Sequence, residues 1–242
     1  AAAGVAGASA PLEVVPGAAA ALAFTVQPGG AAAGELLSPP VEVSLRDAFG
    51  NAVADDGVAV SLELQGGQAG ASLLGTATAL TVGGRATFAD LAVDLAAGGY
   101  ALRATGAGLA GADSATFSIT SAAVDPAAST VVASAATATA GGSVALTATA
   151  RDFFGNPVAG AVITFAATGA ANTLTQPGAA TDAAGQAVGS LSSTRAEAKT
   201  ASASAGGASF STTAGVTFQP DVPATATSSL VVAPALVLAN GV

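Results

Sequence analysis

The chain has 242 residues, a mass of 22.2 kDa and a net charge of −9, and only 9% of its residues are charged and 4% aromatic. It contains no His, Cys, Met or Trp, which excludes a His-based triad, a cysteine nucleophile, and zinc or haem held by imidazole, thiolate or thioether. The acidic balance argues against nucleic acid as a partner, because binding to phosphates needs Lys and Arg.

Alanine is abundant and favours helices, but the rest of the pattern favours strands. Gly punctuates the chain, Val and Thr fill the segments between, and no apolar run reaches the roughly 18–20 residues of a membrane helix, so we expect no membrane insertion. A strand is predicted at 41–46, where Val41, Val43 and Leu45 alternate with polar residues. The same two-residue period predicts later strands with one face formed by Val58, Val60, Leu62 and Leu64; by Tyr100, Leu102 and Ala104; by Ala115, Phe117 and Ile119; by Val144, Leu146 and Ala148; and by Val162, Thr164 and Ala166. Short strands at near-regular spacing predict a β-sandwich.

Three turns with the same chemistry connect these strands. Asp47, Asp152 and Asp182 each precede a Gly by three residues, as in a type I turn. We expect each carboxylate to accept hydrogen bonds from backbone N–H groups, and each Gly to adopt the left-handed conformation.

The chain contains an internal repeat, which is clearest around the first two of these turns. Residues 46–53 (RDAFGNAV) match 151–158 (RDFFGNPV), 105 positions later. Weaker matches relate 4–8 to 108–112 and 129–141 to 229–241. These offsets indicate that the chain is built from repeating units of about 100 residues. We therefore expect a last strand of a preceding domain or linker at 1–17, a domain at 18–122, a second at 123–223, and the first strand of a following domain at 224–242.

The second unit resembles the bacterial immunoglobulin-like domains of the invasin and intimin type. The resemblance rests on residues 151–160 (RDFFGNPVAG), 162–165 (VITF) and 181–187 (TDAAGQA), in the order and spacing of that family. The first unit shares the turn but departs later, at Asp55-Asp56 and Gly83-Gly84. The resemblance implies an all-β fold of tandem immunoglobulin-like β-sandwiches, with about seven strands each. It also implies an extracellular or cell-surface location, because family members are usually stalk modules of long surface proteins.

Acidic clusters are the first candidates for a metal site. Asp55 and Asp56, together with Asp47, form the densest cluster, but calcium takes six to eight oxygen ligands. Asp125 and Asp221 stand at the expected domain junctions, with one carboxylate each. We expect solvated loops and linkers at these positions rather than calcium sites.

Three further candidates have structural interpretations. Asp90 and Asp94 are a close carboxylate pair, as a glycosidase needs, but no aromatic residue stands between them to stack a sugar. Phe153 and Phe154 lie in a turn near a junction, where packing against the neighbouring domain is favoured over ligand binding. Tyr100 is predicted to clamp the backbone through its hydroxyl. We therefore assign no catalytic, cofactor-binding or metal-binding residues, and no cofactor.

The composition, repeat and resemblance together predict a structural spacer of a long extracellular bacterial surface protein or adhesin, not an enzyme. The expected partners are neighbouring domains of the same array, and the ligand of the parent protein stays unknown. Two alternatives remain open. One is a subunit of an extracellular fibre that assembles by strand addition through homotypic contacts. The other is a ligand-binding or accessory module of a secreted protein.

Overall fold

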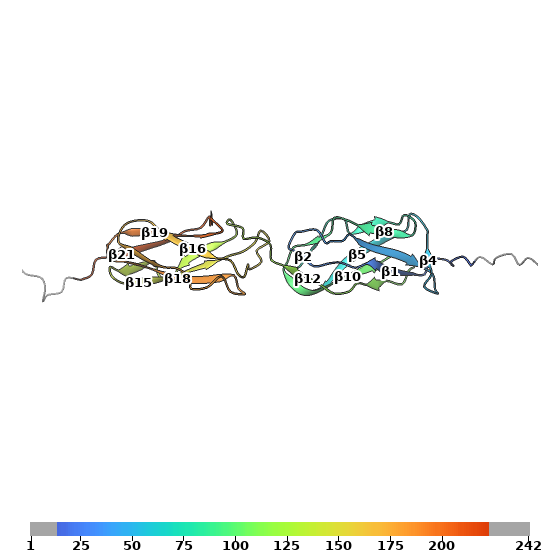
Figure 1. Ribbon diagram of the computed structural model, residues 1–242, viewed down its shortest axis with the longest axis horizontal. Helices are drawn as coiled ribbons and strands as arrows, with labels where there is room; N and C mark the ends of the chain where they lie inside the picture. The colour runs from blue at the N-terminus through green and yellow to red at the C-terminus, as the bar shows by residue number, and fades with distance from the viewer. Residues whose placement is uncertain (1–13, 223–242) are drawn as a thin grey trace, which may run out of the picture. The chain divides into compact units, whose positions relative to one another are not determined.

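The computed structural model describes residues 14–222, which form only strands, turns and irregular segments. These residues fall into two compact units. The first holds the described residues up to Val124 together with Arg151–Val158, and the second holds Asp125–Ala150 and the described residues from Ala159 onward. Figure 1 draws the strands of the first unit in blue to green and those of the second in yellow-green to red. Among the described residues there is no helix that could cross a membrane.

The first unit is a sandwich of two main sheets. One sheet has the order β1-β3-β4, with β8 also paired to β3; the other has the order β2-β12-β10-β5-β7, with β11 paired to β10. The bounds of these strands are β1 Ala21–Val26, β2 Ala31–Ala32, β3 Val41–Arg46, β4 Ala52–Val53, β5 Ala59–Gly66, β7 Thr78–Leu80, β8 Arg85–Phe88, β10 Ala97–Thr105, β11 Ala112–Asp113 and β12 Phe117–Thr120. A separate two-stranded pair joins β6 (Leu73–Leu74) to β9 (Ala92–Val93).

The second unit repeats this architecture with fewer strands. Its sheets have the orders β13-β15-β18-β17 and β14-β21-β19-β16, with β20 paired to β19. When β13 and β14 are counted as one strand that changes sheet, and the two-residue β20 is left out, the expected seven strands remain. Their bounds are β13 Thr130–Ala133, β14 Thr137–Thr139, β15 Ser143–Thr149, β16 Ile163–Ala167, β17 Asn172–Thr175, β18 Gln186–Ser193, β19 Ala198–Ala205, β20 Ala208–Ser209 and β21 Ala214–Gln219.

In both units the opening strand crosses from one sheet to the other. β1 pairs antiparallel with β3, and then β2 pairs parallel with β12 in the opposite sheet. β13 pairs antiparallel with β15, and then β14 pairs parallel with β21. The first and last strands of each unit therefore lie side by side and run in the same direction.

The cores consist of the alternating residues that the sequence indicated. Tyr100, Leu102 and Ala104 on β10 are fully buried, and so are Leu146 and Ala148 on β15. Because side chains on a strand alternate between faces, one face of each strand forms the core between the two sheets. The all-β sandwich prediction is confirmed at this level.

For one strand the predicted face is wrong. The pattern placed Val162, Thr164 and Ala166 inward, whereas the structure buries Ile163 and Phe165 and leaves Val162 73% exposed. A shift of one residue exchanges the two faces of a strand. The larger apolar area of Ile163 and Phe165 selects the observed face, because burial is favoured in proportion to apolar area.

The predicted domain boundary at 122 lies inside the described residues, and the predicted boundary at 223 lies just beyond them. Of the strand expected at 1–17 only residues 14–17 are described, and the strand expected at 224–242 lies outside the described residues.

Candidate functional site

The Asp47 turn is closed by its own carboxylate. Oδ1 of Asp47 accepts the backbone N–H groups of Phe49 at 2.9 Å and Asn51 at 2.8 Å. Oδ2 accepts the amide Nδ2 of Asn51 at 2.9 Å and the backbone N–H of Gly17 at 3.0 Å. The Asn51 amide and the Gly17 N–H stabilise the charged form and lower the pKa of Asp47 to about 2.

The Asp152 turn repeats this geometry atom for atom. Its Oδ1 accepts the N–H groups of Phe154 at 3.0 Å and Asn156 at 2.9 Å. Its Oδ2 accepts Nδ2 of Asn156 and the N–H of Ala122, both at 2.9 Å. Asp152 has no exposed surface, so its four donors replace the water that a carboxylate otherwise requires.

The third turn, at Asp182, has the same hydrogen bonds to the backbone. Oδ1 of Asp182 accepts the N–H groups of Ala184 and Gln186, each at 2.9 Å. Gly50, Gly155 and Gly185 close the three turns with φ of 88°, 83° and 76°, in the left-handed region. The prediction for all three turns is confirmed, and it makes these aspartates structural acceptors.

The other acidic candidates do not converge on a common centre. Asp56 accepts the N–H of Gly83, Asp125 that of Ala127, and Asp221 that of Val222. Within residues 14–222 no group of three or more His, Cys, Asp or Glu side chains is placed to hold a metal ion. The expectation of solvated loops stays the simplest interpretation of Asp55 and Asp56, both of which are exposed.

Asp90 and Asp94 each anchor a different point of one loop. Asp90 accepts the hydroxyl of Thr76 at 2.7 Å and its N–H at 3.1 Å, and these bonds lower the pKa of the Asp90 carboxyl. Asp94 accepts the N–H of Ser72 at 2.7 Å. The lowered pKa favours the ionised form of Asp90, which suits a hydrogen-bond acceptor and does not suit a general acid.

Tyr100 is the predicted clamp. Its hydroxyl donates to the carbonyl of Leu95 at 2.9 Å, and its ring lies 5.9 Å from that of Phe117. A Cβ at Gly67 would approach the tyrosine ring to 2.0 Å, so a side chain there would displace the ring. The sequence prediction of a hydroxyl bound to backbone is confirmed.

The two phenylalanines of the Asp152 turn differ. Phe154 packs against the core of the first unit, whereas Phe153 is 77% exposed and meets Phe154 edge to face at 5.3 Å between ring centroids.

One buried charge was missed at the level of sequence. The side chain of Lys199 has no exposed surface, and its ammonium group donates to Oε1 of Glu197 at 2.6 Å and to the carbonyl of Ala170. The bond from Lys199, followed by the N–H of Ala170, lowers the pKa of Glu197. The available signal was the alternation on β19, which places Lys199 on the same face as the buried Ala201 and Ala203.

Two shallow depressions on the described surface have little chemistry. One, of about 260 Å³, is lined mainly by Val, Ala and Gly of β13 and β21. The other, of about 430 Å³, lies beside the Asp47 turn between Val14–Pro16 and Arg46, Gly50, Asn51 and Ala52. Neither brings together an acid, a base and a nucleophile, which a catalytic pocket requires.

One known protein family matches the second repeat. Residues 126–219 match the bacterial Ig-like domain (group 1), which confirms the resemblance carried by 151–187. No curated protein matches the chain.

Solved structures share the fold at low identity. The Escherichia coli adhesin FdeC is 19% identical over 86% of this chain and 67% of that chain, with a TM-score of 0.51. Invasin, a bacterial integrin-binding protein, is 23% identical over 83% of this chain and 39% of that chain, with a TM-score of 0.44. InvD of Yersinia pseudotuberculosis is 18% identical over 83% of this chain and 58% of that chain, with a TM-score of 0.47. The chain thus spans well under two thirds of invasin and InvD. With the FdeC match and the family match, the tandem immunoglobulin-like fold is established.

Proposed function

We propose that this chain is a structural spacer of a longer bacterial surface protein or adhesin, exposed outside the cell, and that it has no catalytic role. The observation that carries the proposal is the repeated Asp turn. In both copies, at Asp47 and at Asp152, the carboxylate accepts hydrogen bonds from the same backbone and Asn donors. These aspartates close turns in both repeats. A repeated turn of this kind supports a structural role for the repeating unit.

The pairing of the terminal strands supports a role under load. β14 and β21 are parallel neighbours, with Ala138 opposite Phe218, and Ala140 N–H donates to the carbonyl of Gln219 at 2.8 Å. Pulling on the two ends of the unit would draw these parallel strands in opposite directions. Their hydrogen bonds lie across the pulling direction, so several must break together before the strands separate.

The surface location is supported by likeness to a known surface protein. The fold of the chain is shared with FdeC, which is described as an adhesin.

The outer edge of one sheet is protected, which favours a spacer over a strand-exchanging fibre. β16 is an edge strand, and the side-chain amide of Gln176 covers its outer backbone. Oε1 of Gln176 accepts the N–H of Phe165 at 2.7 Å, and Nε2 donates to the carbonyl of Phe165 at 2.9 Å. A covered edge resists pairing with another chain.

Force spectroscopy on the whole chain tests the proposal. We expect two unfolding events, each releasing roughly 100 residues and so about 340 Å of extended chain. Ala140→Pro removes the bond from Ala140 to Gln219, so it should lower the force of one event and leave the other unchanged.

Three results would contradict a spacer. The chain could extend without resistance, it could polymerise in sedimentation as its concentration rises, or it could bind a glycan or protein saturably in an array. Polymerisation would favour the fibre, and saturable binding would favour a ligand-binding module.

A further inference from the structure

The two copies of the repeated turn have the same internal geometry but different exposure. Phe49 is 91% exposed, whereas its counterpart Phe154 packs against the core of the first unit. Asn51 is exposed, whereas its counterpart Asn156 is only 3% exposed. Since the hydrogen bonds within the turns are the same, the difference lies in what surrounds each turn.

The surroundings of Phe154 and Asn156 define a specific receiving surface in the first unit. The ring of Phe154 lies over Gly34, where a Cβ would approach the ring to 2.4 Å. Oδ1 of Asn156 accepts the N–H of Ala96 at 2.9 Å, and Nδ2 donates to the carbonyl of Asp94 at 2.9 Å. The phenylalanine is therefore received by a glycine. The asparagine, two residues further on, is bound by a carbonyl and an amide that are themselves two residues apart.

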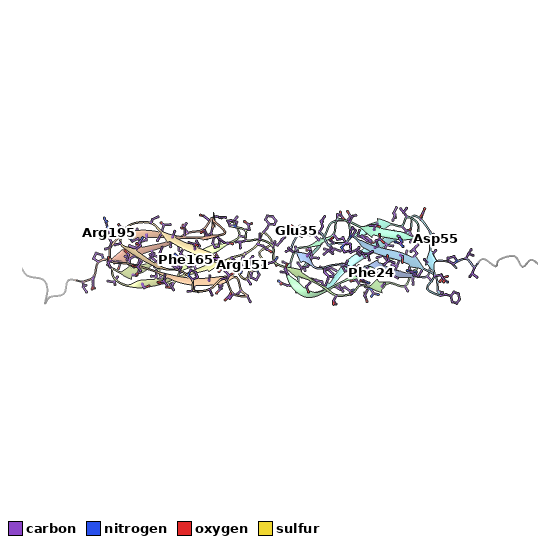
Figure 2. All side chains as sticks on the ribbon, in the orientation of Figure 1. Phe24, Glu35, Asp55, Arg151, Phe165 and Arg195 are labelled. Carbon is purple, nitrogen blue, oxygen red and sulfur yellow. The ribbon has the colours of Figure 1, made fainter. Side chains whose placement is uncertain are left out.

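The receiving surface and the exposed turn lie at opposite ends of the first unit. Figure 2 labels Glu35, next to Gly34, at one end, and Asp55, close after the Asp47 turn, at the other. In Figure 1, β2 and β4 mark the same two ends. A unit with this arrangement receives one turn and presents another.

The residues that lead into the Asp47 turn also have buried counterparts. Val14 is 84% exposed, whereas Ile119, 105 positions later, is 3% exposed on β12. Gly17 donates to Asp47 as Ala122, its counterpart, donates to Asp152. The segment 14–17 thus matches the end of a last strand, and the depression of about 430 Å³ lies between this segment and the turn.

From these observations we propose that the turn at 47–53 is a docking element for a further immunoglobulin-like unit on its N-terminal side. Phe49 packs over a glycine of that unit, and the side chain of Asn51 bonds a carbonyl and an amide two residues apart. The last strand of that unit runs into Val14–Gly17, as β12 runs into Ala122. The proposal rests on the proposed array function and adds the contact that holds one unit to the next.

A thiol-labelling experiment tests this directly, because the chain contains no cysteine. Asn51→Cys reports the accessibility of the turn and leaves Phe49 in place. Labelling is compared between the 242-residue chain and an extended chain, in which residues 18–122 are added once more, directly ahead of residue 18. In the extended chain the substitutions are made in the original copy only, so that the added copy provides the receiving surface. We expect about ten-fold or more slower labelling in the extended chain, since a docked thiol reacts only when the contact opens. Adding Phe49→Ala should restore fast labelling.

Matched variants make each outcome decisive. Ala48→Cys should react equally fast in both chains, because its counterpart Phe153 is exposed. Asn156→Cys in the 242-residue chain should react slowly, and faster with Phe154→Ala. Equal rates for Asn51→Cys in both chains would overturn the docking proposal, and would leave the spacer intact if the extended chain is monomeric and resists force. Protection that grows with concentration in the 242-residue chain would also overturn it, because a second copy would then be the occupant.

Discussion

At the scale of single residues, Asp47 shows how a carboxylate can be fully engaged without a ligand. Four donors from the turn and from Gly17 converge on its two oxygens. Each donor favours the charged form, so protonation costs the folded state more than the unfolded chain. The sequence indicated the backbone donors of the turn, but not Gly17, because that contact joins residues 30 positions apart.

The depressed pKa of Asp47 predicts an acid-sensitive contribution to stability. The folded pKa is about 2 and the unfolded value is about 3.9, so the contribution is complete above about pH 4 and is lost as the pH falls towards 2. Asp47→Asn should lower the melting temperature at neutral pH, and the difference from the unmodified chain should shrink between pH 4 and 2. Thermal unfolding monitored by circular dichroism measures this.

Asp55→Asn is the control for this prediction, because Asp55 is exposed in the neighbouring loop. It should leave the melting temperature nearly unchanged at neutral pH. A destabilisation by Asp47→Asn that stays constant from neutral pH to pH 2 would show that charge does not carry the contribution.

The buried pair of Lys199 and Glu197 predicts an asymmetry between its two partners. Lys199 has no exposed side-chain surface, whereas 27% of the Glu197 side chain reaches solvent. Removing one partner of a buried pair leaves the other charge unpaired, and the cost is larger for the charge that water cannot reach. Glu197→Gln should therefore lower the melting temperature more than Lys199→Met, which keeps the apolar stem. The reverse order in thermal unfolding would contradict this account, and Arg195→Ala, in the exposed ion pair with Glu197, is the control.

At the scale of elements, close packing of strands limits which residues a strand can carry. Gly189 lies within β18, where a Cβ would stand 2.3 Å from the carbonyl oxygen of Thr175 on β17 and 2.9 Å from the ring of Phe165. The sequence shows the glycine but not the reason for it, because these neighbours come from two other strands.

Two glycines in strands of the second unit give a matched test of this packing. Gly189→Ala should destabilise the chain by about 1–3 kcal/mol, because the added methyl forces the backbone or the ring to move. Gly215→Ala on β21 should be close to neutral, because a Cβ there meets no atom within 4 Å. Denaturant unfolding measures both, and equal effects would contradict the packing explanation.

The face of a strand can be predicted only where one set of alternating residues is clearly more apolar. On β10, Tyr100, Leu102 and Ala104 leave one choice, and the structure agrees. On β16 both sets contain apolar residues, but Ile163 and Phe165 offer the larger apolar area, and these two residues are buried. The size of the side chains therefore decides the face where the alternation alone does not.

At the scale of the whole molecule, the distribution of acidic residues predicts that folding does not depend on calcium. In the described part of the chain no group of three or more acidic side chains is placed to hold a metal ion. An ion raises the stability of a protein only if it binds the folded state. Excess calcium should therefore leave the melting temperature unchanged, as should a chelator. A rise with calcium that the chelator reverses would contradict this.

The sequence alone determined the fold class, the repeat and the role of the Asp turns. These follow from local rules: the two-residue period, and the preference of an Asp and a following Gly for one kind of turn. Tertiary structure decided the sheet crossing of β1–β2 and β13–β14, the burial of Lys199, and the different surroundings of Phe49 and Phe154. Each of these depends on contacts between residues far apart in the chain, and identical local motifs acquire different burial when different surfaces meet them.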